Sequence, residues 1–564
     1  MKRERKKKIH YGRIVFLLLL IAAAVYGSGF LLKGFKKIGS KDYYVKSSSL
    51  TVPLYDDEFK EVTDLSRGTK LTIASKEVKN EEESYYRIKK GEEEYYIKTS
   101  DLTENKEEIV EEKEMFVRTP ATIYKDLNSS KILSFGKKGE ALEIVGFDEV
   151  SDTGAVKSYK VKKDDKEGYI YGKYLEFTKE KAEVNYDHNG SYEVHASRED
   201  YLRGGSAGNL DYFPVEKPKF KNNVMPEEVK ALYLNAGVLD SIDEYIALAK
   251  ESGINAFVVD IKDDTEPGYE SLVMKELSPT SYKYAINTMD EYRKVIQKIK
   301  DAGIYVIGRI TTFKDSYYIA DHPEDAILDN ETGAPYEHDG SYWPSAFKRT
   351  IWEYDVELAK EAVKEMGFNE IQFDYVRFPD RTYYDEEDGI INFQNEYGEE
   401  KAQAIQNFLR YACDEIHKLG AYVSADVFGE SAHNYVTGYG QYWGAISNVV
   451  DVISGMPYPE LFNKYEYGFD DPVWTIPYDL LKLWSTSYVL KQQELVPTPA
   501  IVRTWIQAYD ATWKYPEAIY DSDMVSDEIR GLYDSGIRNG FIAWNGGSSL
   551  SKYRALSDAF KKEY

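Results

Sequence analysis

The segment MGFNEIQFD, residues 366–374, joins the end of a predicted helix to the start of a predicted strand. A predicted helix ends at Met366 with its apolar side chains along one stripe, and Gly367 fits the left-handed position that ends a helix. The apolar run after this glycine is typical of a strand buried on both faces of a parallel sheet. The segment therefore predicts a helix that turns into a buried strand, and the strand ends in a carboxylate at Asp374.

The same pattern recurs in the C-terminal part of the chain. The copies are ESGINAFVVD (251–260), DAGIYVIGR (301–309), LGAYVSAD (419–426) and DSGIRNGFIAW (534–544). Apolar runs at 229–235, 449–455 and 500–504 bring the predicted strands to eight. Alternating strands and helices indicate an α/β protein with a parallel sheet, and eight units predict a closed (β/α)8 barrel, a TIM barrel, over residues 223–564. An open, doubly wound sheet would need a Gly-x-Gly-x-x-Gly motif after its first strand, and none follows residues 229–235.

Two similar segments precede the barrel. GTKLTI (68–73) and GEALEIV (139–145) each join a turn glycine to alternating apolar residues, and an aromatic strand follows each copy. The repeat resembles bacterial SH3-like domains, so we assign residues 42–104 and 115–178 to two small all-β barrels. The resemblance implies that they bind a cell-wall polymer; the alternative is that they only hold the barrel away from the membrane. The polar residues 179–222 predict a linker.

The N-terminus carries a membrane-targeting pattern. Residues 1–13 are strongly basic and residues 14–32 carry no charge. A helix over that uncharged run would rise about 28 Å, close to the roughly 30 Å of a bilayer's hydrocarbon core. We therefore predict a cytoplasmic tail, a transmembrane signal anchor at 14–32 and a single-pass protein of the bacterial cell membrane whose bulk is extracytoplasmic. The alternative is a cleaved signal peptide.

The composition excludes several function classes. Lys and Arg total 72 against 97 Asp and Glu, a net charge of −25, so nucleic acid is not an expected partner. Cys413 is the single cysteine, and none of the seven histidines forms a His-x-x-x-His pair. We therefore expect no metal and no cofactor, which disfavours a metal-dependent polysaccharide deacetylase.

Polar side chains end several predicted strands. Asp260, Arg309, Asp374 and Asp426 each follow an apolar run, at the C-terminal strand ends where barrel enzymes carry out their chemistry. Some of them could instead pair with one another merely to close the barrel. Hydrolysis of a glycosidic bond needs one ionised and one protonated carboxyl group, so this edge favours a sugar-processing enzyme.

The catalytic residues follow from these positions. Asp374 and Asp426 end neighbouring strands, and we predict Asp374 as the nucleophile or charge stabiliser and Asp426 as the general acid/base. Glu430, in the loop after Asp426, is a rival for the acid role. Arg377 is predicted to orient the nucleophile.

Aromatic residues gather in the same region. All eight tryptophans lie at or after residue 343. Trp343, Trp505 and Trp544 follow strands, where their flat faces could stack on sugar rings. Aromatic and carboxylate side chains together at these strand ends fit a carbohydrate site better than a phosphate site.

The barrel resembles the putative glycoside hydrolase domain family of bacterial surface proteins over about residues 225–560. The similar segments are FVVDIKD (257–263), IQFDYVRFP (371–379), SADVFG (424–429), MPYP (456–459), RTWIQ (503–507) and GFIAWN (540–545). The resemblance implies functional roles for Asp260, Asp374, Arg377, Asp426, Arg503 and Gln507. We predict Arg309, Tyr458 and the three tryptophans as further substrate-binding residues.

The predicted function is that of a membrane-anchored, extracytoplasmic glycoside hydrolase that acts on a cell-wall or surface polysaccharide through its carboxylate pair. The alternative is a non-catalytic carbohydrate-binding or wall-scaffolding protein built on the same barrel.

Overall fold

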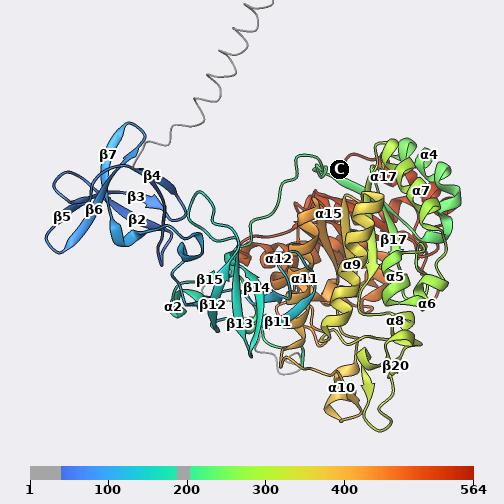
Figure 1. Cartoon of the computed structure of the whole chain (residues 1–564). Helices are drawn as coiled ribbons and strands as arrows, with labels where there is room; N and C mark the ends of the chain where they lie inside the picture. Colours follow the sequence, from blue (N-terminus) through green and yellow to red (C-terminus); the bar gives the residue numbers. More distant parts are fainter. Residues whose placement is uncertain (1–39, 187–202) are drawn as a thin grey trace, which may run out of the picture. The chain divides into compact units, whose positions relative to one another are not determined.

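A computed structural model describes residues 40–186 and 203–564 (Figure 1). The described chain forms two compact units. One holds residues 40–115 and Leu142–Lys173, and the other holds Phe116–Ala141 and the chain from Tyr174 onward.

The first unit is built of antiparallel strands. A three-stranded sheet has the order β4 (Lys70–Ile73), β1 (Lys41–Val45), β8 (Leu102–Thr103). A five-stranded sheet has the order β3 (Glu61–Ser66), β2 (Thr51–Tyr55), β7 (Glu93–Lys98), β6 (Glu83–Lys90), β5 (Val78–Asn80). Both sheets contribute to one core of Val45, Val52, Leu54, Ile73, Ile88, Ile97 and Leu102. The SH3-like identity of residues 42–104 and 115–178 stays a prediction.

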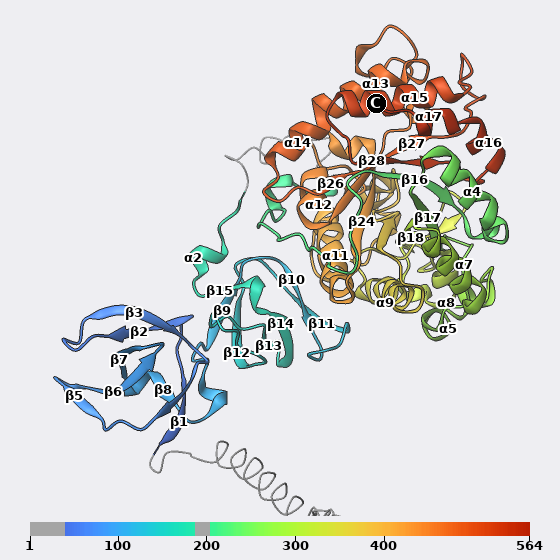
Figure 2. The same ribbon diagram turned by 90° about the horizontal axis from the view of Figure 1, so that it is seen from above.

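The second unit contains a nearly closed parallel barrel of nine strands (Figure 2). Their order around the barrel is β26 (Ile501–Val502), β25 (Val452–Met456), β24 (Tyr422–Phe428), β22 (Glu370–Asp374), β18 (Tyr305–Thr311), β17 (Ala256–Lys262), β16 (Val229–Leu234), β28 (Gly540–Trp544) and β27 (Thr504–Gln507). The two end strands, β26 and β27, are separated in the sequence by Arg503 alone. One interrupted strand therefore joins both ends of the sheet, which accounts for eight predicted strands and nine observed ones.

Helices alternate with the strands and surround the barrel (Figure 2). They are α4 (Ile242–Ser252), α7 (Met289–Asp301), α9 (Arg349–Met366), α11 (Lys401–Ile416), α12 (Trp443–Val449), α13 (Pro477–Trp484), α15 (Ser522–Asp534) and α17 (Ser557–Lys561). Gly253 and Gly367 end α4 and α9 in the left-handed conformation, with φ of 72° and 73°. The predicted α/β architecture with a parallel barrel is confirmed.

Arg503, the residue between β26 and β27, forms a buried ion pair. Arg503 is fully buried and donates from Nη1 to both carboxylate oxygens of Glu370, at 2.8 and 3.1 Å. Glu370 is the first residue of β22, so this pair lies at the N-terminal end of the barrel. The prediction of Arg503 as a substrate-binding residue is therefore corrected: its side chain is committed to the opposite end of the barrel from the predicted site.

The predicted linker, residues 179–222, is only partly described, because residues 187–202 lie outside the described chain. Its second half packs on the barrel rather than spanning open space. Ala207, Leu210 and Tyr212 are buried in one cluster with Ala402 and Val436. Apolar side chains in this otherwise polar stretch account for the difference.

The predicted membrane location is corrected. The predicted span, residues 14–32, lies outside the described residues. Within residues 40–186 and 203–564, no helix combines the length and the apolar character needed to cross a bilayer. We therefore withdraw the assignment to a single-pass membrane protein and the cytoplasmic membrane as a partner.

Barrel closure predicts a position that requires glycine. Gly540 opens β28 with φ of 102°, and a Cβ there would lie 1.9 Å from the carbonyl oxygen of Val229. Gly540→Ala combines backbone strain with overpacking, so we expect a loss of roughly 2–4 kcal/mol of stability. Gly303→Ala is the matched control, because Gly303 has φ of 79° but no atom within 4 Å of the methyl group that alanine would add; it should lose only about 1 kcal/mol. Urea unfolding of both variants measures this, and equal losses would contradict the close approach of β16 and β28.

Candidate active site

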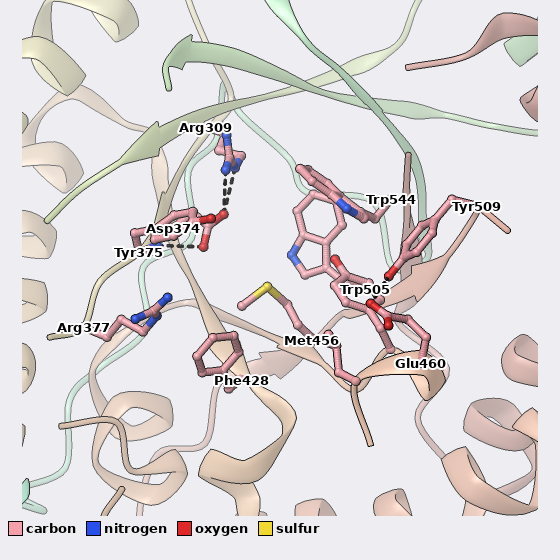
Figure 3. A pocket seen from close by; sticks show the side chains of 12 residues that line it. Arg309, Asp374, Tyr375, Arg377, Phe428, Met456, Glu460, Trp505, Tyr509 and Trp544 are labelled. Carbon is pink, nitrogen blue, oxygen red and sulfur yellow. Dashed lines mark hydrogen bonds and ion pairs between the residues drawn. The ribbon is translucent and has the colours of Figure 1, made fainter. Parts of the chain in front are cut away.

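A pocket opens at the C-terminal ends of the barrel strands (Figure 3). Its lining residues are Arg309, Asp374, Tyr375, Arg377, Phe428, Met456, Tyr458, Glu460, Leu461, Trp505, Tyr509 and Trp544. The cavity volume of about 240 Å³ is below the ~300–1,000 Å³ typical of pockets for drug-sized ligands. The pocket thus has a size suited to a small part of a longer ligand.

Asp374 presents its carboxylate to this pocket. It ends β22, and Arg309, two residues before the end of β18, donates to its Oδ2 from Nε at 3.0 Å and from Nη2 at 2.8 Å. The backbone N–H of Tyr375 donates to Oδ1 at 2.7 Å. Tyr375 has a φ of 49°, an uncommon value for a non-glycine residue. Three N–H groups therefore orient the carboxylate.

Asp260 lies behind Arg309. Its Oδ1 accepts from Arg309 Nη1 at 2.8 Å, and its Oδ2 accepts from the hydroxyl of Tyr233. Burial raises the pKa of Asp260 to about 6, although Arg309 acts against that shift. Asp260 does not line the pocket; it holds the arginine that holds Asp374.

Asp426 is fully buried and does not line the pocket. Its Oδ1 accepts from Trp505 Nε1 at 2.7 Å, and its Oδ2 has no hydrogen-bond partner among the described residues. Burial, followed by the charge of Asp374, raises the pKa of Asp426 well above its usual range. The two predicted catalytic aspartates are thus neighbours, but only Asp374 reaches the cavity.

Glu430 is also directed away from the pocket. Its two carboxylate oxygens accept from Tyr435 and Tyr439, each at 2.9 Å. Both hydroxyls come from the same loop, and this local clamp explains why the side chain does not reach the lining.

A carboxylate that the sequence analysis did not select, Glu460, lies on the pocket wall across from Asp374 (Figure 3). It directly follows the segment MPYP (456–459) at the end of β25, a position that was its only signal in the sequence. Tyr509 donates to its Oε1 at 3.0 Å, and Lys514 lies 3.9 Å from its Oε2. Gln507 accepts from the backbone N–H of Glu460 at 3.2 Å. Gln507 is thus a positioning group beneath the pocket.

The predicted tryptophans occupy different places. Trp505 and Trp544 line the cavity, with ring centres 5.5 Å apart at 84° to each other. Trp343 is buried behind Arg377, with the guanidinium carbon 5.1 Å from its ring centre. Tyr458 lines the pocket as predicted. In residues 40–186 and 203–564, no three His, Cys, Asp or Glu side chains gather in a way that could hold a metal ion.

A family model matches residues 231–550, more than half of the chain, and its description is "Putative glycosyl hydrolase domain". The chain belongs to this family, and we class it as a glycoside hydrolase. No match was found among curated proteins.

Solved structures also resemble the chain. A hypothetical protein from Ruminiclostridium thermocellum ATCC 27405 is 35% identical over 35% of this chain and 97% of its own, with a TM-score of 0.30. The PgaB (BpsB) glycoside hydrolase domain from Bordetella bronchiseptica is 13% identical over 60% of this chain and 100% of its own, with a TM-score of 0.43. The spore cortex-lytic enzyme SleL from Bacillus cereus is 12% identical over 62% and 76%, with a TM-score of 0.34.

The burial of Asp426 predicts a pH dependence of stability. Its pKa is raised in the folded chain, so above the ordinary Asp pKa of about 4 the unfolded chain has released this proton while the folded chain keeps it up to its own, higher pKa. The carboxyl group should therefore lower the free energy of unfolding by up to about 1.4 kcal/mol per pH unit as the pH rises. Asp426→Asn removes this loss, so its unfolding free energy should fall less than that of the wild type between pH 5 and 7. Urea titrations at both pH values test this. Asp388→Asn, at an exposed residue, is the control. Parallel curves for Asp426→Asn and wild type would rule the shift out.

Proposed function

We propose that the chain hydrolyses a glycosidic bond of a cell-wall or surface polysaccharide at this pocket, with Asp374 as its ionised carboxylate. One observation carries the proposal: Asp374 faces the cavity while Arg309 and the N–H of Tyr375 fix both of its oxygens. Charge that develops on a sugar ring during bond cleavage is positive, and a fixed carboxylate stabilises it.

The second carboxyl group in this proposal is Glu460. It comes from a different strand end and lies on the other side of the cavity, so a sugar could bind between the two groups. In its acid form Glu460 would protonate the leaving oxygen, while Asp374 would attack the anomeric carbon or stabilise the oxocarbenium-like transition state. Asp426 was the acid expected from the sequence. Its complete burial favours a different role, in which it stays protonated and fixes the indole of Trp505.

Exposed aromatic side chains near the pocket support a polymeric substrate. Trp513 is 65% exposed and stacks on the pocket residue Tyr509, with the ring planes 15° apart. Tyr515, two residues on, is 85% exposed. Sugar units that continue from the pocket could lie across these rings. The small β units at 42–104 and 115–178 would bind a wall polymer as SH3-like domains, a role that their internal sequence repeat supports.

Two substitutions test the carboxyl pair. Asp374→Asn and Glu460→Gln should each lower kcat by about 10²- to 10⁴-fold, because each removes a charge or a proton that the chemistry needs. Reducing-end release from purified wall and capsular polysaccharides measures this. Glu331→Gln, an exposed residue, is the matched control and should keep full activity. If Glu460→Gln is fully active and Asp426→Asn is inactive, the acid role belongs to Asp426. Full activity in Asp374→Asn would contradict the hydrolase mechanism proposed above.

A further inference from the structure

Arg377 places a buried positive charge on the pocket wall. The residue is 9% exposed, and its guanidinium lies beside Asp374 in the cavity lining (Figure 3). The guanidinium carbon lies 4.6 Å from the ring centre of Phe428 and 5.1 Å from those of Trp343 and Tyr375. Nη1 donates to the carbonyl oxygen of Phe378 at 3.0 Å. Aromatic faces and one carbonyl group therefore surround the charge.

This cation has no carboxylate partner within the described residues. No Asp or Glu oxygen in residues 40–186 or 203–564 comes within 4.0 Å of it. Asp374 is already bound by Arg309 and by the N–H of Tyr375. Asp380, further along the same loop, pairs with Arg381 instead, with 3.7 Å between its Oδ2 and Arg381 Nε.

A buried charge without a counterion is unfavourable, and proteins generally pair such groups. Burial accordingly lowers the pKa of Arg377 from its ordinary value. The aromatic rings offset only part of the lost hydration, since a cation–π contact contributes about 0.5–2 kcal/mol. An anion that enters the pocket would complete the set of partners. A planar guanidinium suits a carboxylate or a phosphate, because its parallel N–H groups match two oxygens at once.

We propose that Arg377 binds an acidic group on the sugar chain, a carboxylate or a phosphate, and that the substrate is therefore an anionic polysaccharide. This inference rests on the proposed hydrolase function and extends it to a substrate class. A neutral sugar would offer only hydroxyl groups to the same N–H donors and would leave the charge uncompensated.

The acidity of the whole protein does not oppose this. The net charge of −25 repels anions at long range, but physiological salt screens exposed charges beyond about 8 Å. Within the pocket, Asp374 is bound by Arg309 and makes no ion pair within 4.0 Å with Arg377. The N–H groups of Arg377 are thus not taken up by a carboxylate of the described chain and can meet an anion at short range.

The test on activity compares matched substrates. A glucuronate-containing wall polysaccharide is assayed before and after chemical reduction of its carboxylates to neutral hydroxymethyl groups, and a phosphorylated glycan is assayed before and after phosphatase treatment. The wild type should prefer one acidic form over its neutral form by about 10- to 100-fold in kcat/KM. Arg377→Gln should abolish that preference, and Arg377→Lys should retain part of it. Arg381→Gln, four residues along the same loop and 81% exposed, should leave it intact.

A binding test separates this inference from the hydrolase proposal. Glucuronate and inorganic phosphate are titrated into the full-length wild type and each variant by calorimetry, after thermal melting has shown that the variants are folded. If Arg377→Gln alone binds one of the two ligands about tenfold or more weakly than the wild type, the result supports the anion site even if no polymer is cleaved. Cleavage with no preference for the acidic substrate, or equal binding by wild type and Arg377→Gln, would overturn the inference and leave the hydrolase proposal standing.

Discussion

The ion pairs of the buried Arg309 guanidinium hold the polar groups at the mouth of the barrel in place. It donates from one side to Asp260 and from the other to Asp374, and those residues lie on the two strands next to its own, β17 and β22. An ionised aspartate that is buried without a partner costs several kcal/mol of stability, and these two carboxylates flank the guanidinium from either side. A shared cation removes most of that penalty. The remaining aspartate, Asp426, avoids it in another way, because burial raises its pKa and keeps it protonated.

This arrangement divides the polar groups into two layers. Asp260, Asp426 and Gln507 lie beneath the cavity and hold Arg309, Trp505 and the backbone of Glu460. The groups they hold line the cavity together with Asp374. Such support matters because catalytic geometry must be fixed before substrate arrives, and a side chain whose neighbours are locked loses little freedom on binding.

Much of the barrel could be predicted from the sequence because its signals are local. A glycine at a helix end, followed by a continuous apolar run, identified five of the eight strands, and apolar runs alone identified the other three. The polar residue after such a run also identified the correct end of the barrel, and Asp374 and Arg309 do lie in the pocket there. Position along a strand could not show what covers a side chain. The indole of Trp505 bonds to Asp426, and Glu370 holds Arg503 at the other end of the barrel. Both partners are distant in sequence, so neither contact leaves a local pattern.

The roles of loop residues were harder to predict from the sequence, because they too depend on partners that are distant in the chain. The loops also show how a side chain that stabilises the fold differs from one that is available to a ligand. Glu430 and Glu460 are both loop glutamates after a strand, yet Glu430 has a tyrosine hydroxyl on each oxygen, whereas Glu460 has one hydroxyl and a lysine at 3.9 Å. Arg309 and Arg377 differ likewise: carboxylates surround the first, and aromatic rings surround the second. A polar group whose bonding capacity is filled by its own chain stabilises the fold and has little left to offer a substrate. Residue type was the same within each pair, so only the three-dimensional set of partners separates the group that holds the site from the group that faces its ligand.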